Sequence, residues 1–309
     1  MRLLRFACGV GLLFILVVCP ARPQISPTDL WTAELVNSYR VTPNVTYGIA
    51  NNVELKLDLY LPRSATGPVP AVMCIHGGGW VAGNKDSYSL LLMPYLAKGW
   101  AAVNVEYRLA SSSLAPAAVE DCRRALRWLW VHAKQYNLDT TKIIVTGHSA
   151  GGHLALITGL LPPISEFDRT PEWAQELIPL HVAAIINWFG ITDVTDLLDG
   201  PNMQPYAVSW LGTLSNREDL ARRVSPINYV GPSSPPTLSI HGTKDPLVPY
   251  THATRLHEAL TKAGVPNKLI TIPGGGHGGF SNKDLDMIYR AIDAFLNENV
   301  IQPDEPSKR

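Results

Sequence analysis

A sharp turn between a strand and a helix is the feature that most constrains the fold of this chain. The β-branched run 143–145 leads into Gly147-His148-Ser149-Ala150-Gly151, and an apolar run at 153–157 follows. A buried strand that enters a helix through a glycine-flanked serine has the pattern of a nucleophile elbow, which exposes the serine side chain on a strained turn. The positions two residues before and after the serine must lack bulk, and both are glycine. The pattern predicts a nucleophile at Ser149.

A glycine run follows an earlier strand. The strand-like segment 69–75 passes directly into His76-Gly77-Gly78-Gly79-Trp80. Glycine lets backbone N–H groups approach a reacting carbonyl, and N–H groups aimed at a developing oxyanion stabilise the transition state. We therefore expect the N–H groups of Gly78, Gly79 and Ala150 to form an oxyanion hole. A tight turn without that role is the simpler alternative, but it leaves the pairing with the downstream serine turn unexplained.

An acid and a base are expected in loops that follow later strands, in the chain order Ser, Asp, His. Asp245 follows the strand-like run 236–240, and His277 lies in a glycine-rich loop after 268–272. An imidazole can take the serine proton and return it to the leaving group, while a carboxylate orients the ring and stabilises its charged form. The alternatives are an Asx turn at Asp245 and a solvated loop histidine at His277.

These motifs in combination resemble the α/β-hydrolase family. The segments His76–Trp80 and Gly147–Gly152, with Tyr107-Arg108-Leu109, are similar to the hormone-sensitive-lipase and carbohydrate-esterase-like branch, over about 44–300. The resemblance implies a short-chain carboxylesterase that uses Ser149, His277 and Asp245, with acetyl-xylan or feruloyl esterases as near possibilities. An amidase or arylformamidase with the same triad and a non-catalytic binding protein on a hydrolase scaffold are the alternatives.

Other polar residues near these motifs are expected to be structural. The histidines that flank the motifs should shape their loops: His76, His148 and His241. Asp193 and Asp196 follow the strand-like run 181–188, so either could be a spare acid, although helix capping is the expected role. Glu120 and Asp121 begin a long amphipathic pattern, where negative charge suits the helix dipole.

The periodicity of the chain predicts one α/β domain. The run 53–59 alternates strictly, as a half-exposed antiparallel strand should. Later runs are continuously apolar, which indicates burial on both faces and a mostly parallel sheet: 71–75, 101–105, 143–145, 182–186 and 238–240. Helical patterns alternate with them at 87–98, 117–135, 152–161, 252–263 and 285–299. The expected architecture is a doubly wound sheet with helices on both faces, whose ligands bind at the strand carboxyl ends.

Two segments break this alternation, at about 162–180 and 196–236. Long irregular segments in compact domains are often functional, so we expect both to cover the site as a cap or a pocket wall. Four aromatic residues are candidates to contact substrate, with ordinary core packing as the alternative for each: Trp80, Trp188, Tyr206 and Trp210.

The N-terminus predicts export. Two arginines precede an apolar stretch at 6–18 that is too short for a comfortable membrane span and suits a signal peptide at 1–21. An N-terminal segment at 22–43, a hydrolase domain at 44–300 and a tail at 301–309 would follow. The expected location is secreted or periplasmic, with no stable membrane span after cleavage; a lipid on Cys19 or an uncleaved signal anchor are the alternatives.

The charge balance narrows the partners. The signal segment holds two of the 26 basic residues and none of the 26 acidic ones, so its removal leaves a slightly negative chain. Such a balance does not favour nucleic acid or an anionic membrane surface, which leaves a small-molecule or polysaccharide-linked ester. Cys74 and Cys122 are expected to be separate buried thiols. No cysteine and histidine spacing indicates a metal site, and no cofactor is expected.

Overall fold

The structure, a computed structural model, describes residues 27–169, 177–213 and 215–301, so the predicted signal peptide and most of the predicted tail lie outside the described residues. The chain divides into two units, Met1–Asn37 and Ser38–Arg309. The described part of the first unit is the helix α1 (Pro27–Asn37). No described helix is both long enough and apolar enough to cross a membrane.

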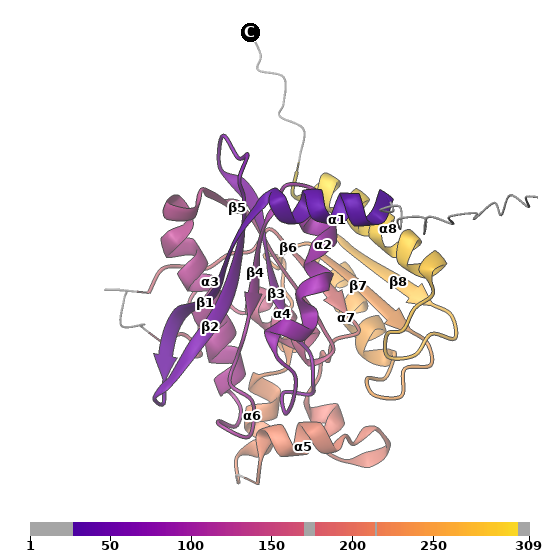
Figure 1. Cartoon of the computed structure of the whole chain (residues 1–309). Coiled ribbons are helices and arrows are strands. Elements are labelled where there is room, and N and C mark those ends of the chain that lie inside the picture. Colours follow the sequence, from indigo (N-terminus) through magenta and orange to yellow (C-terminus); the bar gives the residue numbers. More distant parts are fainter. Residues whose placement is uncertain (1–26, 170–176, 214, 302–309) are drawn as a thin grey trace, which may run out of the picture. The chain divides into compact units, whose positions relative to one another are not determined.

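The second unit is built on an eight-stranded sheet in the order β1-β2-β4-β3-β5-β6-β7-β8 (Figure 1), as far as the described residues go. Its strands are β1 (Tyr39–Ala50), β2 (Val53–Pro62), β3 (Val69–Ile75), β4 (Ala101–Val105), β5 (Leu138–His148), β6 (Ala184–Trp188), β7 (Thr237–Gly242) and β8 (Asn267–Ile272). The β1–β2 and β2–β4 pairs are antiparallel, and all other neighbours are parallel. This confirms the mostly parallel sheet predicted from the sequence.

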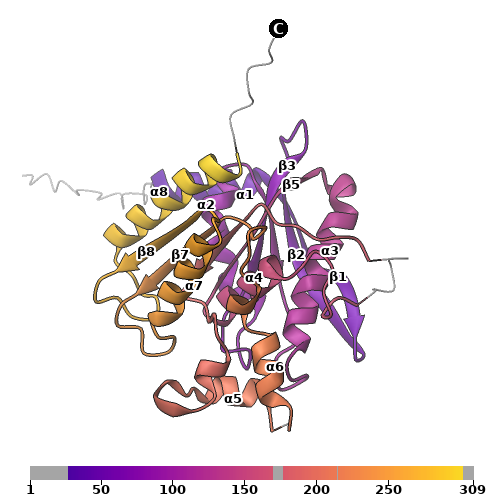
Figure 2. The ribbon, with the colours of Figure 1, turned by 180° about the vertical axis from the view of Figure 1, so that it is seen from behind.

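Helices cover both faces of the sheet. The longer ones are α3 (Ala117–Tyr136), α4 (Ala150–Leu160), α7 (Thr251–Lys262) and α8 (Asn282–Asn299); shorter ones are α2 (Met93–Leu96), α5 (Pro205–Leu211), α6 (Arg217–Arg223) and the 3-10 turns η1 (Lys85–Leu92), η2 (Thr195–Leu197), η3 (Gly200–Asn202) and η4 (Pro226–Tyr229). The helices α3, α4 and α7 lie on the face seen in Figure 2, and α2 and α8 on the opposite face. The short helices α5 and α6 lie beyond the edge where the parallel strands end (Figure 1).

The core follows from the apolar runs. Every residue of β4, β6 and β7 is buried, as strands covered by helices on both faces must be. Helix α4 is buried along almost its whole length, which explains why its sequence is apolar all round. Cys74 in β3 and Cys122 in α3 are both buried and free.

Some elements differ from the sequence prediction. Strand β1 begins at Tyr39, before the expected domain start, and was hidden by Pro43 and Asn44, which interrupt the alternation. A proline is tolerated there because β1 is an edge strand, and the pairing shifts register between Thr42 and Val45. The expected helix 87–98 is instead the 3-10 turn η1 followed by the short α2, which has Pro94 in its first turn.

The two irregular segments have different positions. The described residues of 162–180 pack against α3, where Arg123 pairs with Asp168 and donates to the carbonyl of Pro162. The cavity that Pro162 and Leu180 line is separate from the one that contains Ser149, so these described residues do not form a wall of the latter. The segment 196–236 instead carries α5, whose Tyr206 lines the cavity that contains Ser149.

A buried ion pair joins the strand ends to α3. The Asp121 carboxylate accepts hydrogen bonds from the backbone N–H of Arg108 (3.0 Å) and from its guanidinium Nε (2.8 Å) and Nη2 (2.7 Å). Both side chains are almost fully buried. Arg108 follows Tyr107, whose ring stacks on His76 just before the glycine run, so this ion pair fixes the segment after β4 against the helix.

We predict that Asp121→Asn will destabilise the protein by about 3 kcal/mol, because it leaves the buried Arg108 charge with only the more distant carboxylate of Glu120, 3.7 Å from its Nη2. Urea unfolding at pH 7 measures the change. The matched control is Asp286→Asn, which breaks an exposed pair with Arg290 and should leave the midpoint unchanged. Equal midpoints for the two variants would contradict this account of the buried pair.

Candidate active site

Ser149 occupies the turn between β5 and α4. Its backbone is strained, with φ 56° and ψ −120°, in a region that non-glycine residues rarely adopt. The turn is held because the Ser149 N–H donates to the Trp188 carbonyl at 2.9 Å and the Ser149 carbonyl accepts from His153 at 2.9 Å. The serine therefore stands at the N-terminus of α4, at the carboxyl ends of the parallel strands.

The turn can form only because Gly151 lets two backbones approach closely. A Cβ atom there would lie 2.1 Å from the carbonyl oxygen of Ile75 and 2.5 Å from that of His76. Both carbonyls are backbone groups at the end of β3, which cannot give way. The same contact therefore brings the serine turn against the start of the glycine run.

The glycine run has free donors beside the serine. Gly78 has φ 114°, and its carbonyl accepts the N–H groups of Val81 and Ala82. Within the described part of the chain, no group accepts a hydrogen bond from the N–H of Gly78 or Gly79. Ala150 is the first residue of α4, where an N–H has no partner inside the helix. Gly78 and Gly79 line the same cavity as Ser149, and Ala150 follows the serine directly in the chain.

His76 shapes the glycine run, as the sequence predicts. Its Nδ1 lies 2.8 Å from the carbonyl oxygen of Gly77, so this nitrogen carries the proton and donates. The ring stacks on Tyr107 with centroids 4.2 Å apart, and the Tyr107 hydroxyl donates to the His76 carbonyl at 3.0 Å. These contacts fix the point at which the chain leaves β3.

His277 and Asp245 meet from two different loops. The Nδ1 of His277 lies 2.7 Å from Oδ2 of Asp245, after β8 and β7 respectively. The His277 ring also packs edge-on against Phe189, with centroids 4.6 Å apart. The acid and the base proposed from the sequence are therefore hydrogen-bonded, and His277 lines the same cavity as Ser149.

The Asp245 carboxylate is completely buried and receives several hydrogen bonds. Its Oδ1 accepts the N–H groups of Leu247 (2.8 Å) and Val248 (3.0 Å). Its Oδ2 lies 3.3 Å from Nε2 of His241. Burial raises the pKa of Asp245, but the hydrogen bonds from His241, His277 and Val248 outweigh it and hold that pKa below its ordinary value.

His241 is a residue whose part the sequence reading did not identify. Its Nε2 faces two acceptors, the Val248 carbonyl at 2.9 Å and the Asp245 carboxylate, so this nitrogen donates. The signal was present in the spacing, because His241 and Asp245 lie four residues apart across the end of β7. His241 thus supports the acid, in addition to shaping its loop.

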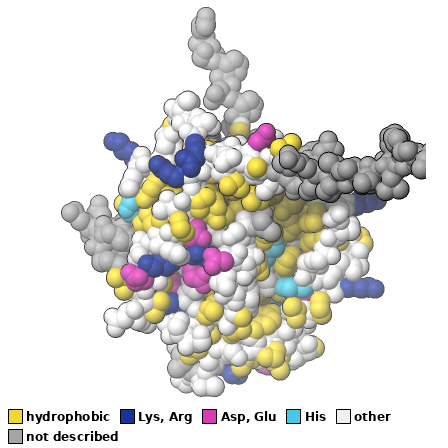
Figure 3. Space-filling model, viewed as in Figure 1, with side chains coloured by type: hydrophobic (Ala, Val, Ile, Leu, Met, Phe, Trp, Pro, Cys, Tyr) yellow, Lys and Arg dark blue, Asp and Glu magenta, His cyan; other side chains and the backbone are white. Residues whose placement is uncertain are grey.

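A cavity of about 540 Å³ opens at Ser149. It is lined by Gly78, Gly79, Val81, Tyr88, His148, Ser149, Phe189, Tyr206, Leu247, His277, Gly278 and Gly279. No lysine, arginine, aspartate or glutamate belongs to this described lining. On the face seen in Figure 3, histidine side chains right of the centre lie among hydrophobic ones, and a compact group of acidic and basic side chains lies further left.

Of the four aromatic residues predicted to contact substrate, only Tyr206 lines this cavity. Trp80 and Trp210 are completely buried and stack on each other with centroids 4.2 Å apart. Trp188 is almost fully buried beneath His148. The structure corrects the expectation for these three tryptophans, because their rings pack in the core behind the cavity lining rather than in the lining itself. Trp80 Nε1 also donates a hydrogen bond to His153.

His148 lines the cavity as a neutral ring. Burial and, to a smaller extent, the electrostatic effect of the neighbouring His277 together lower the pKa of His148 to about 3. The ring stacks on Trp188 with centroids 4.9 Å apart. Its Nδ1 is buried and has no hydrogen-bond partner among the described residues, so His148 does not shape its loop through hydrogen bonds as expected.

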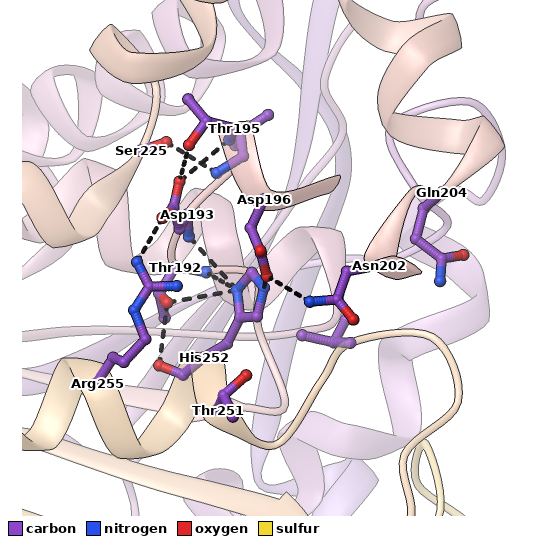
Figure 4. Close-up of polar contacts among 12 residues, drawn as sticks. Thr192, Asp193, Thr195, Asp196, Asn202, Gln204, Ser225, Thr251, His252 and Arg255 are labelled. Carbon is purple, nitrogen blue, oxygen red and sulfur yellow. Dashed lines mark hydrogen bonds and ion pairs between the residues drawn. The ribbon is translucent and has the colours of Figure 1, made fainter. Parts of the chain in front are cut away.

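The two spare acids contact other partners (Figure 4). Asp193 accepts the N–H of Thr195 at 3.1 Å, which is close to the expected capping role, and pairs with Arg255. The Oδ2 of Asp196 lies 3.1 Å from Nε2 of His252. Neither carboxylate pairs with His277. Among the described residues, no group of three His, Cys, Asp or Glu side chains is arranged to hold a metal ion.

The fold and the site together define an α/β-hydrolase fold: a mostly parallel sheet, a serine turn after β5, an acid after β7 and a histidine after β8. A family model described as BD-FAE matches residues 57–260, more than half of the chain, and the chain belongs to this family. A second model, described as TAP-like protein, matches residues 217–306.

Individual relatives agree with this assignment. A probable carboxylic ester hydrolase, LipM of Mycobacterium tuberculosis, is 32% identical over 216 residues, which cover 67% of this chain and 48% of LipM. The esterases LipQ and LipC of the same organism are 30% and 28% identical. The chain spans about half the length of these curated relatives.

Solved structures cover more of the chain. A truncated carbohydrate esterase from gut microbiota superposes with a TM-score of 0.72 at 28% identity, over 86% of this chain and 98% of the other. A butyrate-bound esterase from Thermogutta terrifontis superposes with a TM-score of 0.72 at 26% identity, over 87% and 96%. These similarities confirm the α/β-hydrolase fold.

We predict that His148 makes stability fall with acid. Its pKa is about 3 when folded and about 6.5 when unfolded, so only the unfolded chain takes up this proton between those values. The stabilisation is complete above pH 6.5 and is lost as the pH falls below it. Between pH 6 and pH 5, the free energy of unfolding of His148→Gln should therefore fall by about 1 kcal/mol less than that of the unchanged protein.

Urea unfolding at a series of pH values measures this slope, which is the change in the free energy of unfolding with pH. Ser149→Ala is the control, because it removes no group that titrates in this range and should keep the slope of the unchanged protein. An unaltered slope in His148→Gln would mean that the ring is not held neutral in the folded state.

Proposed function

We propose that this protein is an exported carboxylic-ester hydrolase that acts through an acyl-enzyme on Ser149. One observation carries the proposal: a strained serine, a histidine bonded to a buried carboxylate and unpaired glycine N–H groups surround one open cavity. Nucleophile, base, orienting acid and oxyanion donors are the parts that acyl transfer requires.

The reaction begins with attack by the Ser149 Oγ on the ester carbonyl. The His277 Nε2 takes the hydroxyl proton as the C–O bond forms, and the carbonyl oxygen becomes an oxyanion. The intermediate collapses, the ester C–O bond breaks, and His277 returns the proton to the leaving alkoxide. Water then attacks the acyl-enzyme in the same way, which releases the carboxylic acid and restores Ser149.

Asp245 supports this cycle as a permanent anion. Because its pKa is lowered, it stays charged at neutral pH and stabilises the imidazolium that forms on His277. The 2.7 Å hydrogen bond to Nδ1 leaves Nε2 as the nitrogen that exchanges a proton with Ser149. The carboxylate holds the ring in the tautomer that can act as a base.

The oxyanion is stabilised by the donors that flank the serine. The N–H groups of Gly78, Gly79 and Ala150 are proposed to donate to it, and removal of one such donor typically costs about 10²–10³-fold in rate. These groups gain a partner only when the carbonyl oxygen becomes charged and moves toward them. They therefore stabilise the transition state more than the bound ester.

The cavity supports an uncharged substrate. Its lining offers aromatic and aliphatic walls but, among the described residues, no cation to pair with a carboxylate. The names of relatives, a carbohydrate esterase and a butyrate-bound esterase among them, support short acyl groups on small or carbohydrate-linked alcohols. The basic and apolar N-terminal sequence supports export by a signal peptide.

We predict that Ser149→Ala will lower kcat for p-nitrophenyl acetate by ~10⁵-fold or more, because it removes the nucleophile. Initial rates at neutral pH measure the loss, and an unchanged circular dichroism spectrum shows that the fold persists. Ser111→Ala, at an exposed serine away from the cavity, is the control and should keep full activity. Comparable turnover by Ser149→Ala and the unchanged protein would refute the proposed mechanism.

A further inference from the structure

One peptide group connects the wall of the cavity to the acid. The carbonyl of Leu247 and the N–H of Val248 belong to the same planar peptide unit and point in opposite directions. The N–H donates to Asp245 Oδ1 at 3.0 Å, and the carbonyl accepts the hydroxyl of Tyr206 at 2.8 Å. The orientation of this plane therefore fixes both hydrogen bonds together.

Tyr206 is well placed to hold that plane. It lies in the first turn of α5 and lines the cavity, and a Cβ on Gly79 would lie 2.8 Å from its own Cβ, so it also packs against the glycine run. Burial raises the pKa of Tyr206 well above its ordinary value, which keeps the hydroxyl protonated as a donor. A single side chain thus contacts the cavity, an oxyanion glycine and the acid loop.

The segment that precedes Tyr206 is held by hydrogen bonds around His252, which Figure 4 shows. The Nδ1 of His252 accepts the N–H of Thr192 at 3.1 Å, so the proton is on Nε2 and is donated to Asp196 at 3.1 Å. The same carboxylate accepts the Asn202 amide at 3.1 Å. Burial lowers the pKa of His252, which keeps this ring neutral. The anchor joins η2 and η3 to the first turn of α7 and fixes the entry to α5.

We propose that Tyr206 is a positioning residue for Asp245, acting through the peptide group between Leu247 and Val248. The proposal rests on the proposed function, because it assigns a role to Tyr206 in the same reaction. A hydrogen bond to a carbonyl polarises its peptide group, so the Tyr206 hydroxyl strengthens the N–H that Val248 donates to the carboxylate. It also prevents the plane from rotating, which would move Asp245 away from His277.

The test is Tyr206→Phe, which removes the hydroxyl and keeps the ring that forms the wall. We expect kcat for p-nitrophenyl acetate to fall about 10-fold with KM changed less than about twofold, because a small misplacement of a catalytic group is costly in rate. We also expect amide hydrogen exchange of Val248, followed by NMR, to become about 10-fold faster as its peptide plane loosens.

Tyr229→Phe is the matched control. Its hydroxyl donates to the carbonyl of Arg223 at 2.7 Å, the same kind of bond in a part of the chain that does not line the catalytic cavity. It should leave kcat, KM and the Val248 exchange rate unchanged, which separates loss of a tyrosine hydroxyl from loss of this particular one.

The outcomes decide the proposal. A lower kcat together with faster Val248 exchange in Tyr206→Phe alone supports a positioning role. A raised KM with unchanged kcat and exchange would mean that Tyr206 is a wall only, and no change in any quantity would also overturn the proposal. If the unchanged protein hydrolyses no ester, the proposed function fails, and the exchange rate of Val248 still shows whether Tyr206 holds the acid loop.

Discussion

The close approach of Gly151 to the carbonyls at the end of β3 is the contact on which the rest of the site depends. It lets the serine turn and the glycine run meet at one edge of a parallel sheet, where the loops after β7 and β8 also converge. The φ of 56° at Ser149 is maintained because β5 is paired on both sides and α4 is buried along its length. The energetic cost of the strained backbone at Ser149 is thus offset by the packing of the central strands and of α4.

The charge state of the groups in the site depends on their burial and hydrogen bonds rather than on how many charged residues surround them. Asp245 is buried yet remains an anion, because two backbone N–H groups and two histidines donate to it. His148, beside Ser149, is held neutral, so an imidazolium that forms on His277 in the proposed reaction has no second cation as its neighbour in the cavity. A fixed anion on one side and uncharged walls on the other suit a reaction in which His277 gains and loses a proton.

The sequence predicted the features that depend on local patterns. The central strands follow from continuous apolar runs, and the hydrogen bond between His277 and Asp245 agrees with their expected places after β8 and β7.

Features that depend on tertiary packing were not predicted. Strand β1 was hidden by Pro43, which is tolerated only because no further strand pairs with that edge, as far as the described residues go. Trp80 and Trp210 could not be placed from their types, since stacked tryptophans serve equally well as core or as wall. The support that His241 gives to Asp245 could not be predicted from their four-residue spacing alone, because it depends on how the loop between them folds.

The central claim is that Ser149 is the nucleophile and that the glycine N–H groups face its oxyanion. A crystal structure of the protein after reaction with diethyl p-nitrophenyl phosphate tests it most directly, because the tetrahedral phosphorus mimics the first intermediate. We expect phosphorus bonded to the Ser149 Oγ and its phosphoryl oxygen about 3 Å from the N–H groups of Gly78, Gly79 and Ala150. A protein that forms no adduct, or one whose phosphoryl oxygen points away from these three groups, would contradict the account.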